Sequence, residues 1–513
     1  MPATFLKIAA ILVLLPLLMG CRAKPKIAKA PVPAAPDPRI EEYIKQGDAH
    51  FLDFHLYGWR KAETFYKKAL ELEKSEAIKK KLLLAQFLIM TREIDEDIVC
   101  THLQGTVDSL CAGPRTPQEQ ELCGLARQYQ EGFGATYGQK RAAQSKRLDR
   151  TAFDFENSVV DAYLYSLCLR TYGIEDPKDP GVSIAERYKT SPLFLYLNAT
   201  KKDIRQISEY ERQYPEFAEL FALAAEDLFQ ATKYNAARAY FKKAIELLPD
   251  YTRAINGLGN LYLFALEDHE RALEYYESAL KQDPENTAAL FGKGAVLHHI
   301  DKYPESNAAL DRMLESDISR RGRASSASIR YYNAEANYYK AYNCYLMGEL
   351  NRARQFVDTS KSHMPDLEST NYLSGLLFFG EKNLESARKD FLTAVQRGGT
   401  NCNAHYYLGL IDHERGEREA FNWFLRACSC IEGSVRGIEK QIQSVSGLDL
   451  EEIEKATLKV KLEKKLLSFR HSSAAQIDTM IGIVSGAETE KGKYYLDLLN
   501  IVLSRLRLPI NKN

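Results

Sequence analysis

The chain has 513 residues, which is long enough for a large hydrophobic core or for several domains. Lysine and arginine together number 69, as do aspartate and glutamate, so the formal net charge is zero and no nucleic-acid partner is expected. No P-loop, GxSxG or HExxH motif occurs. We therefore expect no catalytic residues, no cofactor and no metal site, and a protein that is not an enzyme.

The first element in chain order is an unbroken non-polar run from Ile8 to Met19, preceded by Lys7. A membrane-spanning helix needs about 20 residues, so this shorter run is typical of the apolar region of a secretory signal. It ends in Leu18-Met19-Gly20-Cys21, which resembles the bacterial lipobox. The resemblance implies a lipoprotein signal peptide at 1–20 and lipidation of Cys21. The expected partners therefore include a membrane, to which the lipid anchors the protein.

Residues 21–39 are expected to form the acylated cysteine and a tether, because the segment is rich in proline, alanine and lysine. Such a composition cannot build a core and favours an extended chain. Position 22 is Arg22, whereas an aspartate there resembles an inner-membrane retention signal. The expected location is therefore the bacterial cell envelope, lipid-anchored at the outer membrane and facing the periplasm.

Residues 40–92 predict a first pair of helices and a continuation, with Gly47 in the first helix and Ala62, Tyr66 and Ala69 in the second. Residues 93–217 depart from this pattern and predict an irregular helical region with an insertion. The glycines at 132, 134 and 138 have no strand before them, so they do not predict a nucleotide site.

A repeated pattern begins near residue 218. The set Ala237, Phe241, Ala244 and Pro249 recurs 35 residues later as Ala272, Tyr276, Ala279 and Pro284. Further copies, complete or partial, are Ala353 with Pro365, then Ala387, Phe391 and Ala394, then Ala420, Phe424 and Ala427. Glycines precede three of the sets, at 259, 375 and 409, and Gly259 recurs 35 residues later as Gly294. Regular recurrence at this period indicates stacked supersecondary units.

The pattern resembles the tetratricopeptide repeat, a helix-turn-helix of 34 residues. The resemblance implies an all-α, right-handed α-solenoid with units at 218–251, 252–286, 287–320, 334–367, 368–401 and 402–434, called below by their first residue. In that family small residues let the two helices touch, and the aromatic residue fills the gap to the next repeat. Unit 252 has one extra residue, expected in a turn near Asp268, and unit 287 carries Ser306 and Met313 where alanine is expected.

After unit 402, residues 435–513 lose the repeat period. An amphipathic helix is expected at 450–469 and an apolar one at 494–506. Because a solenoid must cover the open face of its last repeat, we interpret this region as a C-terminal helical cap.

The family places four positions of each first helix on the concave face, and carrying them over predicts a partner-binding groove. Its residues are Phe229, Arg253, Asn256, Asn260, Leu263, Phe291, His298, Tyr338, Tyr342, Tyr345, Tyr372, Phe379, Tyr406 and His413. Three of them, Tyr338, Tyr342 and Tyr345, have the i, i+4, i+7 spacing of one helical face. The groove is thus expected to be aromatic along most of its length, which suits a binding surface.

The alternative is that this aromatic stripe is core packing. The carboxylate-binding arrangement of some family members is not expected, because Ala222 and Asn256 stand where a lysine is needed. His298 and His299, followed by Asp301, do not predict a metal site, since adjacent helical residues diverge.

Export makes disulfides possible. Three cysteines cluster in the irregular region and favour a disulfide among them: Cys100, Cys111 and Cys123. Cys428 and Cys430 are two apart on a predicted helix, so they should not bridge to each other. Cys344 and Cys402 are expected to be small buried residues.

Two functions are compatible with these features. The first is a membrane-anchored scaffold or adaptor in the envelope that holds a protein or peptide partner in the groove. The alternative is a transporter-associated periplasmic accessory lipoprotein that binds a small ligand.

Overall fold

The structure is a computed structural model that describes residues 37–96, 103–112, 116–131, 150–154, 158–172, 211–316, 326–396, 401–417, 419–486 and 490–507, together with 187, 188, 191 and 193. The predicted signal peptide and Cys21 lie outside the described residues. Every regular element within the described ranges is helical, which confirms the all-α prediction. No helix among these residues is long and apolar enough to cross a bilayer.

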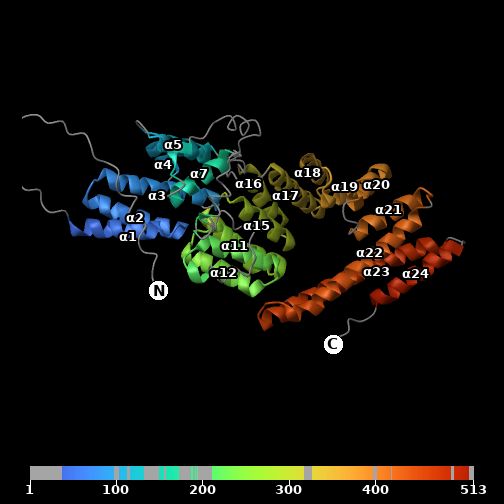
Figure 1. Ribbon diagram of the computed structural model, residues 1–513. Helices are drawn as coiled ribbons and strands as arrows, with labels where there is room; N and C mark the ends of the chain where they lie inside the picture. The colour runs from blue at the N-terminus through green and yellow to red at the C-terminus, as the bar shows by residue number, and fades with distance from the viewer. Residues whose placement is uncertain are drawn as a thin grey trace, which may run out of the picture.

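The N-terminal part begins with a helix pair, α1 (Pro38–Phe51) and α2 (Leu56–Leu72), and continues with α3 (Glu76–Asp95). Gly47 of α1 makes room for the ring of Tyr66 on α2, and a Cβ at Gly47 would lie 2.5 Å from that ring. Beyond it lie α4 (Leu103–Leu110), α5 (Pro117–Glu131), the short η2 (Arg150–Ala152) and α7 (Val159–Tyr172) (Figure 1).

The solenoid consists of paired helices, one pair in each predicted unit (Figure 1). The pairs are α11 (Ala218–Gln230) with α12 (Tyr234–Leu247), α13 (Thr252–Asn260) and η5 (Leu261–Ala265) with α14 (His269–Gln282), α15 (Thr287–His299) with α16 (Tyr303–Glu315), α17 (Ser326–Leu346) with α18 (Leu350–His363), α19 (Glu368–Gly380) with α20 (Leu384–Gln396), and α21 (Cys402–Glu414) with α22 (Ala420–Ser444).

The landmarks of the repeat pack as expected. The ring of Tyr276 lies against glycines of its own unit and of the next one, and a Cβ at Gly259 would lie 2.7 Å from it. Likewise, a Cβ at Gly375 would lie 2.6 Å from Phe391. Ala272 and Ala387 are fully buried. Close helix contact at these positions therefore depends on the missing side chain of glycine and the small one of alanine.

Two irregularities have local causes. The extra residue of unit 252 does not sit in the turn near Asp268: it is absorbed by the π-helical turn η5, where the amide of Leu266 donates to the carbonyl of Leu261 at 3.3 Å. In unit 287, Ser306 replaces alanine without an orphaned hydroxyl, because its Oγ donates to the carbonyl of Gly294 at 2.7 Å.

The C-terminal region is more than an end cap. After η7 (Val445–Gly447), the chain forms the long α23 (Glu452–Ser485) and then α24 (Glu490–Arg507). The second half of α23 and α24 cover the last unit, where Ile477 and Met480 share a core with Phe424. The first half of α23 instead returns to units 218 and 252, where Leu458 and Leu462 share a core with Leu263 (Figure 1).

The cysteines divide into two groups. Cys111 and Cys123 form a disulfide, as the sequence favoured. The expectation that Cys402 is an unpaired buried residue is wrong: it forms a disulfide with Cys430, because the start of α21 and the middle of α22 lie antiparallel with their Cα atoms 5.3 Å apart. Cys428 and Cys344 are buried and free.

Candidate functional site

The tyrosine stripe of unit 334 forms one continuous face of α17. The rings of Tyr338 and Tyr342 stack with their centroids 6.0 Å apart, and those of Tyr342 and Tyr345 are 6.2 Å apart. All three side chains are partly exposed, whereas Ala341, on the side toward α18, is fully buried. Among the described residues no hydroxyl of these three tyrosines has a hydrogen-bond partner. The stripe is therefore an accessible face with free donors and acceptors.

His298 of unit 287 extends this face. Its ring centroid lies 5.4 Å from that of Tyr342 and 5.2 Å from that of Tyr339. Nδ1 of His298 faces Oδ1 of Asn343 at 2.6 Å, and the amide of this buried asparagine donates to Ser306 and Asn307. The polar network beneath the rings thus orients the imidazole, as hydrogen-bonded supporting residues commonly do.

The face continues into the next two units through Tyr372 and Phe379 on α19 and Tyr407 on α21. Tyr407 lies 5.1 Å from Phe379 and stacks on Phe391 at 5.2 Å. Burial raises the pKa of Tyr372, and the nearby hydroxyls of Tyr407, Tyr342 and Tyr345 raise it further. We call the surface formed by the stripe of α17 and by His298, Tyr372, Phe379 and Tyr407 the tyrosine face.

Burial favours the protonated phenol at several tyrosines of this surface. Burial raises the pKa of Tyr338, with a further contribution from the neighbouring tyrosines, and raises the pKa of Tyr339 to about 12. Protonated phenols both donate and accept hydrogen bonds. The surface can therefore recognise carbonyl and amide groups while covering apolar side chains, which is the usual use of tyrosine at interfaces.

Three predicted groove residues are buried inside the chain, so the prediction that they face a partner is wrong for them. Leu263 is 4% exposed, because the π-helical turn and α23 enclose it. Tyr406 is 9% exposed and packs in the core that α23 and α24 form with the last unit. Asn256 is 7% exposed and its amide donates to Oδ1 of Asn286 at 2.9 Å.

Most of the remaining predicted residues already have partners in the chain. Arg253 is ion-paired to Glu96 at 3.0 Å and to Glu226 at 2.7 Å. Asn260 accepts a hydrogen bond from Tyr276 at 2.7 Å. Phe229 packs against Tyr234, Phe291 contacts Tyr332 and Tyr339, and His413 is exposed beyond the tyrosine face. The accessible part of the predicted groove is thus concentrated in units 287 to 402.

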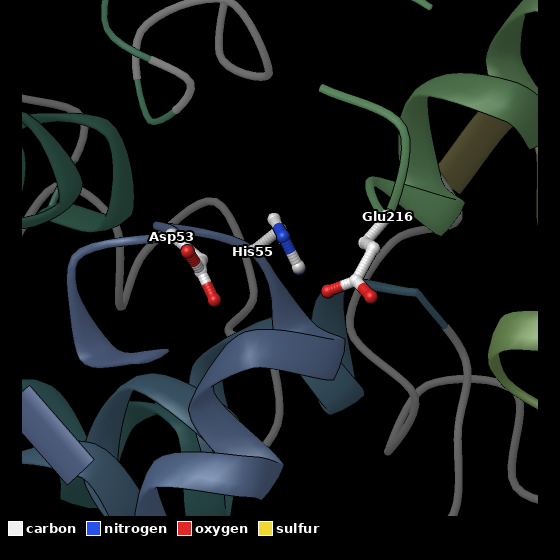
Figure 2. A group of neighbouring side chains, drawn as sticks. All are labelled: Asp53, His55 and Glu216. Atoms are coloured by element: carbon white, nitrogen blue, oxygen red, sulfur yellow. The ribbon is translucent and has the colours of Figure 1, made fainter. Parts of the chain in front are cut away.

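Sequence reasoning missed one member of the face and one polar cluster. Tyr407, not Tyr406, joins the aromatic face, a shift of one helical position caused by the C-terminal helices that cover Tyr406. The missed cluster consists of Asp53, His55 and Glu216, whose potential ligand atoms lie within 4.8 Å of one another (Figure 2). No local motif signals it, because Glu216 is distant in sequence.

The geometry of this cluster does not favour a metal. Nδ1 of His55 accepts the amide of Gly58 at 3.0 Å and so caps α2. Burial lowers the pKa of His55 to about 4, so the neutral ring carries its proton on Nε2, which then has no lone pair for a metal. Asp53 pairs with His50 at 3.0 Å and Glu216 with Lys61 at 3.3 Å. The cluster borders a cavity of about 590 Å³ lined also by Phe54, Tyr188 and Tyr214.

The chain is thus an α-solenoid of helix-turn-helix repeats with an aromatic face on successive first helices. Comparison with known families agrees with this class: residues 261–321 match the family described as tetratricopeptide repeat. A curated relative, Protein CTR9 homolog of Arabidopsis thaliana, is 39% identical over 71 residues, which are 14% of this chain and 6% of that protein. The chain therefore spans only a small part of the length of that relative.

Solved structures with a similar arrangement include YrrB, described as a TPR protein with an unusual peptide-binding site. It is 21% identical with a TM-score of 0.31, over 39% of this chain and 97% of that chain. PilF of Pseudomonas aeruginosa is 18% identical with a TM-score of 0.38, over 44% and 97%. The Cut9–Hcn1 structure is 12% identical with a TM-score of 0.38, over 90% and 96%.

Proposed function

We propose that this protein is a membrane-anchored scaffold in the bacterial envelope that binds a segment of a protein partner on the tyrosine face. The observation that carries the proposal is the stacked tyrosine stripe of α17, whose three hydroxyls are free of partners among the described residues, together with the aromatic contact between Phe379 and Tyr407 on the next two first helices. Aromatic anchors of this kind dominate binding energy at protein interfaces.

The test is partner capture from membranes with the full chain as bait. Replacing Tyr338, Tyr342 and Tyr345 with serine should abolish capture of proteins that the parent retains, while the circular dichroism spectrum stays unchanged. A variant with serine at Tyr331 and Tyr332, two exposed tyrosines of the same helix, is the matched control. Equal capture by the parent and the triple variant would contradict the proposal.

The membrane anchor is a separate part of the proposal and has its own test. The lipobox-like Leu18-Met19-Gly20-Cys21 supports it. Changing Cys21 to serine should release the protein from membranes and remove the label supplied by a palmitate analogue. Label that persists in the serine variant would contradict lipidation at Cys21.

The alternative function, a ligand-binding accessory of a transporter, has one feature in its favour. The cavity beside His55 has about 590 Å³, within the roughly 300–1,000 Å³ common for small-molecule sites. Native mass spectrometry separates the two functions: a small molecule retained by the purified chain favours the accessory, whereas a ligand-free mass together with partner capture favours the scaffold.

A further inference from the structure

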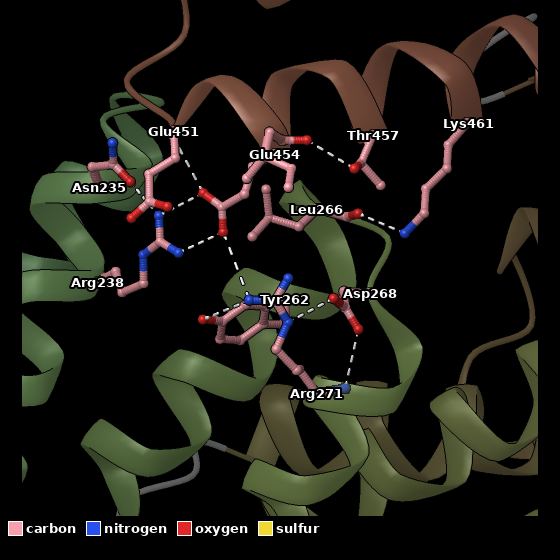
Figure 3. Close-up of polar contacts among 11 residues, drawn as sticks. Asn235, Arg238, Tyr262, Leu266, Asp268, Arg271, Glu451, Glu454, Thr457 and Lys461 are labelled. Carbon is pink, nitrogen blue, oxygen red and sulfur yellow. Dashed lines mark hydrogen bonds and ion pairs between the residues drawn. The ribbon is translucent and has the colours of Figure 1, made fainter.

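The first half of α23 lies against helix ends of units 218 and 252, about two hundred residues earlier in the chain (Figure 3). The contact begins just before α23. The amide of Ala236, in the first turn of α12, donates to Oδ2 of Asp449 at 3.0 Å, and the amide of Asn235 donates to the carbonyl of Asp449 at 2.8 Å. The residue at the N-cap of α12 itself, Lys233, provides no side-chain cap. Asp449 therefore supplies the cap that α12 lacks.

A complementary contact lies two turns into α23. Nζ of Lys461 donates to the carbonyl of Glu267 at 2.7 Å and to that of Leu266 at 3.2 Å, where the first helix of unit 252 ends. A carboxylate thus meets a helix N-terminus and an ammonium meets a helix C-terminus. Both placements agree with the helix dipoles, so the segment is electrostatically matched to this surface.

Between these two contacts lies an ion pair shielded from solvent. Arg238 of α12 holds both carboxylate oxygens of Glu454, at 2.6 and 2.7 Å, and the side chains are 11% and 8% exposed (Figure 3). The hydrogen bond from Arg238 lowers the pKa of Glu454. Removing one member of such a pair leaves the other desolvated without compensation, so the pair is strongly sensitive to substitution.

The second half of the same helix is attached differently. There, Ile477, Met480 and Val484 share an apolar core with Phe424 and Ile431 of the last unit. One helix of 34 residues, about 50 Å long at 1.5 Å per residue, therefore contacts both ends of the row of six units. The curvature of a solenoid is the sum of small rotations between repeats. A rigid connection between its ends restricts that sum.

We propose that α23 is an intramolecular clasp: its second half stays fixed to unit 402, and its first half docks through Asp449, Glu454 and Lys461 onto units 218 and 252, which holds the solenoid in its curved form. Releasing the first half straightens the row of units. The docked half combines these polar contacts with a small apolar set, Leu458 and Leu462, whereas the other half shares a larger apolar core with the last unit and α24. The docked half is therefore the end that opens.

The test uses the full chain with two matched double variants. The clasp variant, Glu454→Gln with Lys461→Ala, removes the buried pair and the carbonyl contacts. The control, Glu452→Gln with Lys459→Ala, makes the same chemical changes at exposed positions of α23. Hydrogen exchange of the Asn235 and Ala236 amides reports docking directly, and small-angle X-ray scattering reports the curvature. Neither measurement involves a partner, so failure here is distinct from failure of the proposed scaffold function.

In the clasp variant these two amides should exchange at least about tenfold faster, and the radius of gyration should rise, whereas the control should match the parent. A disulfide between Asn235→Cys and Asp449→Cys, added to the clasp variant, should return the radius of gyration toward that of the parent; amide exchange is not used for this variant, because it lacks the Asp449 carboxylate that bonds the Ala236 amide. Unchanged exchange and an unchanged radius of gyration in a folded clasp variant would overturn the proposal. So would a general loss of helicity that the disulfide does not restore, since the contact would then belong to the core.

Discussion

Units 252 and 334 place polar or aromatic side chains at equivalent positions of their first helices, yet they use them in opposite ways. In unit 252, Arg253 is ion-paired to Glu96 and Glu226, and Asn256 is bonded to Asn286. In unit 334, Tyr338, Tyr342 and Tyr345 stack on one another and keep their hydroxyls without partners among the described residues. Position in a repeat therefore defines which face a residue is on, while its neighbours decide whether that face is free.

The neighbours differ because each region lies next to a different part of the chain. Unit 252 lies between the N-terminal helices, through Glu96, and the first half of α23, through Lys461. The N-terminal junction is itself charged and buried: Arg92 and Glu219 are 2.8 Å apart with both side chains fully buried. Unit 334 has no such cover over its tyrosine stripe among the described residues. We conclude that the first two units are structural supports and that units 287 to 402 carry the accessible surface.

The largest loss of folding stability is expected when a buried alanine of the repeat pattern is replaced, whichever unit contains it. Ala272→Arg and Ala387→Arg each place a charge in a fully buried helix contact and should cost more than about 3 kcal/mol of folding free energy. Ala308→Arg, at an exposed position of α16, is the matched control and should change stability by less than about 0.5 kcal/mol. Urea denaturation measures both. Equal stabilities for Ala387→Arg and Ala308→Arg would show that the register of the repeats is wrong.

The next largest effect is the dependence of folding stability on pH through His55, in the N-terminal helices. Burial lowers the folded-state pKa of His55 from 6.5 to about 4, so the unfolded chain binds a proton at higher pH than the folded one. Stability contributed by the neutral ring should therefore be present above about pH 6.5 and be lost as the pH falls toward 4, by up to about 3 kcal/mol.

His55→Asn keeps a capping side chain on α2 but removes this titration. The difference in melting temperature between the parent and this variant should thus change between pH 6.5 and 4. A constant difference would contradict the assigned pKa. EDTA should leave the melting temperature of the parent unchanged, since the Asp53–His55–Glu216 geometry does not favour a metal.

A smaller loss of folding stability is expected when an ion pair of unit 252 is removed. Arg253→Met removes the ion pair between Arg253 and the fully buried Glu96, which should cost about 2–3 kcal/mol, somewhat less than a fully buried pair because Arg253 is 25% exposed. Partner capture should be unaffected. Arg352→Met, which breaks an exposed pair with Glu349, is the control and should cost less than about 1 kcal/mol. If Arg253→Met abolished partner capture at unchanged stability, the binding surface would include unit 252.

The sequence predicted what depends on local spacing. The alanines, glycines and aromatic residues of each unit contact one another within one or two helices, so their recurrence is visible in the chain, as Gly375 with Phe391 illustrates. Contacts that join distant segments have no such signal. The docking of Asp449 on Ala236 and the bridge from Cys402 to Cys430 depend on how helices pack in three dimensions.

The errors at the candidate site have the same origin. The repeat period predicts Leu263 in the groove, but the first helix of unit 252 contains a π-helical turn at 261–265, which rotates the positions within it. The family pattern predicts Tyr406 in the groove because it does not include C-terminal helices that return over the last unit. Within α17, where neither complication occurs, the three tyrosines share one face as expected.

The tyrosine stripe of unit 334 gives the most informative test, because the expected loss of stability per ring is small. Replacing Tyr338, Tyr342 and Tyr345 with serine removes rings that are partly exposed and whose hydroxyls bond to nothing in the described chain. If these residues form a binding face, the triple variant should lose about 1–2 kcal/mol for each partly buried ring, and it should fail to capture the partner. If they were core packing, each ring would cost about 3–5 kcal/mol and the variant would melt far below the parent. Thermal unfolding and capture, measured on the same preparation, decide between the two: a large fall in melting temperature would remove the distinction between unit 334 and unit 252.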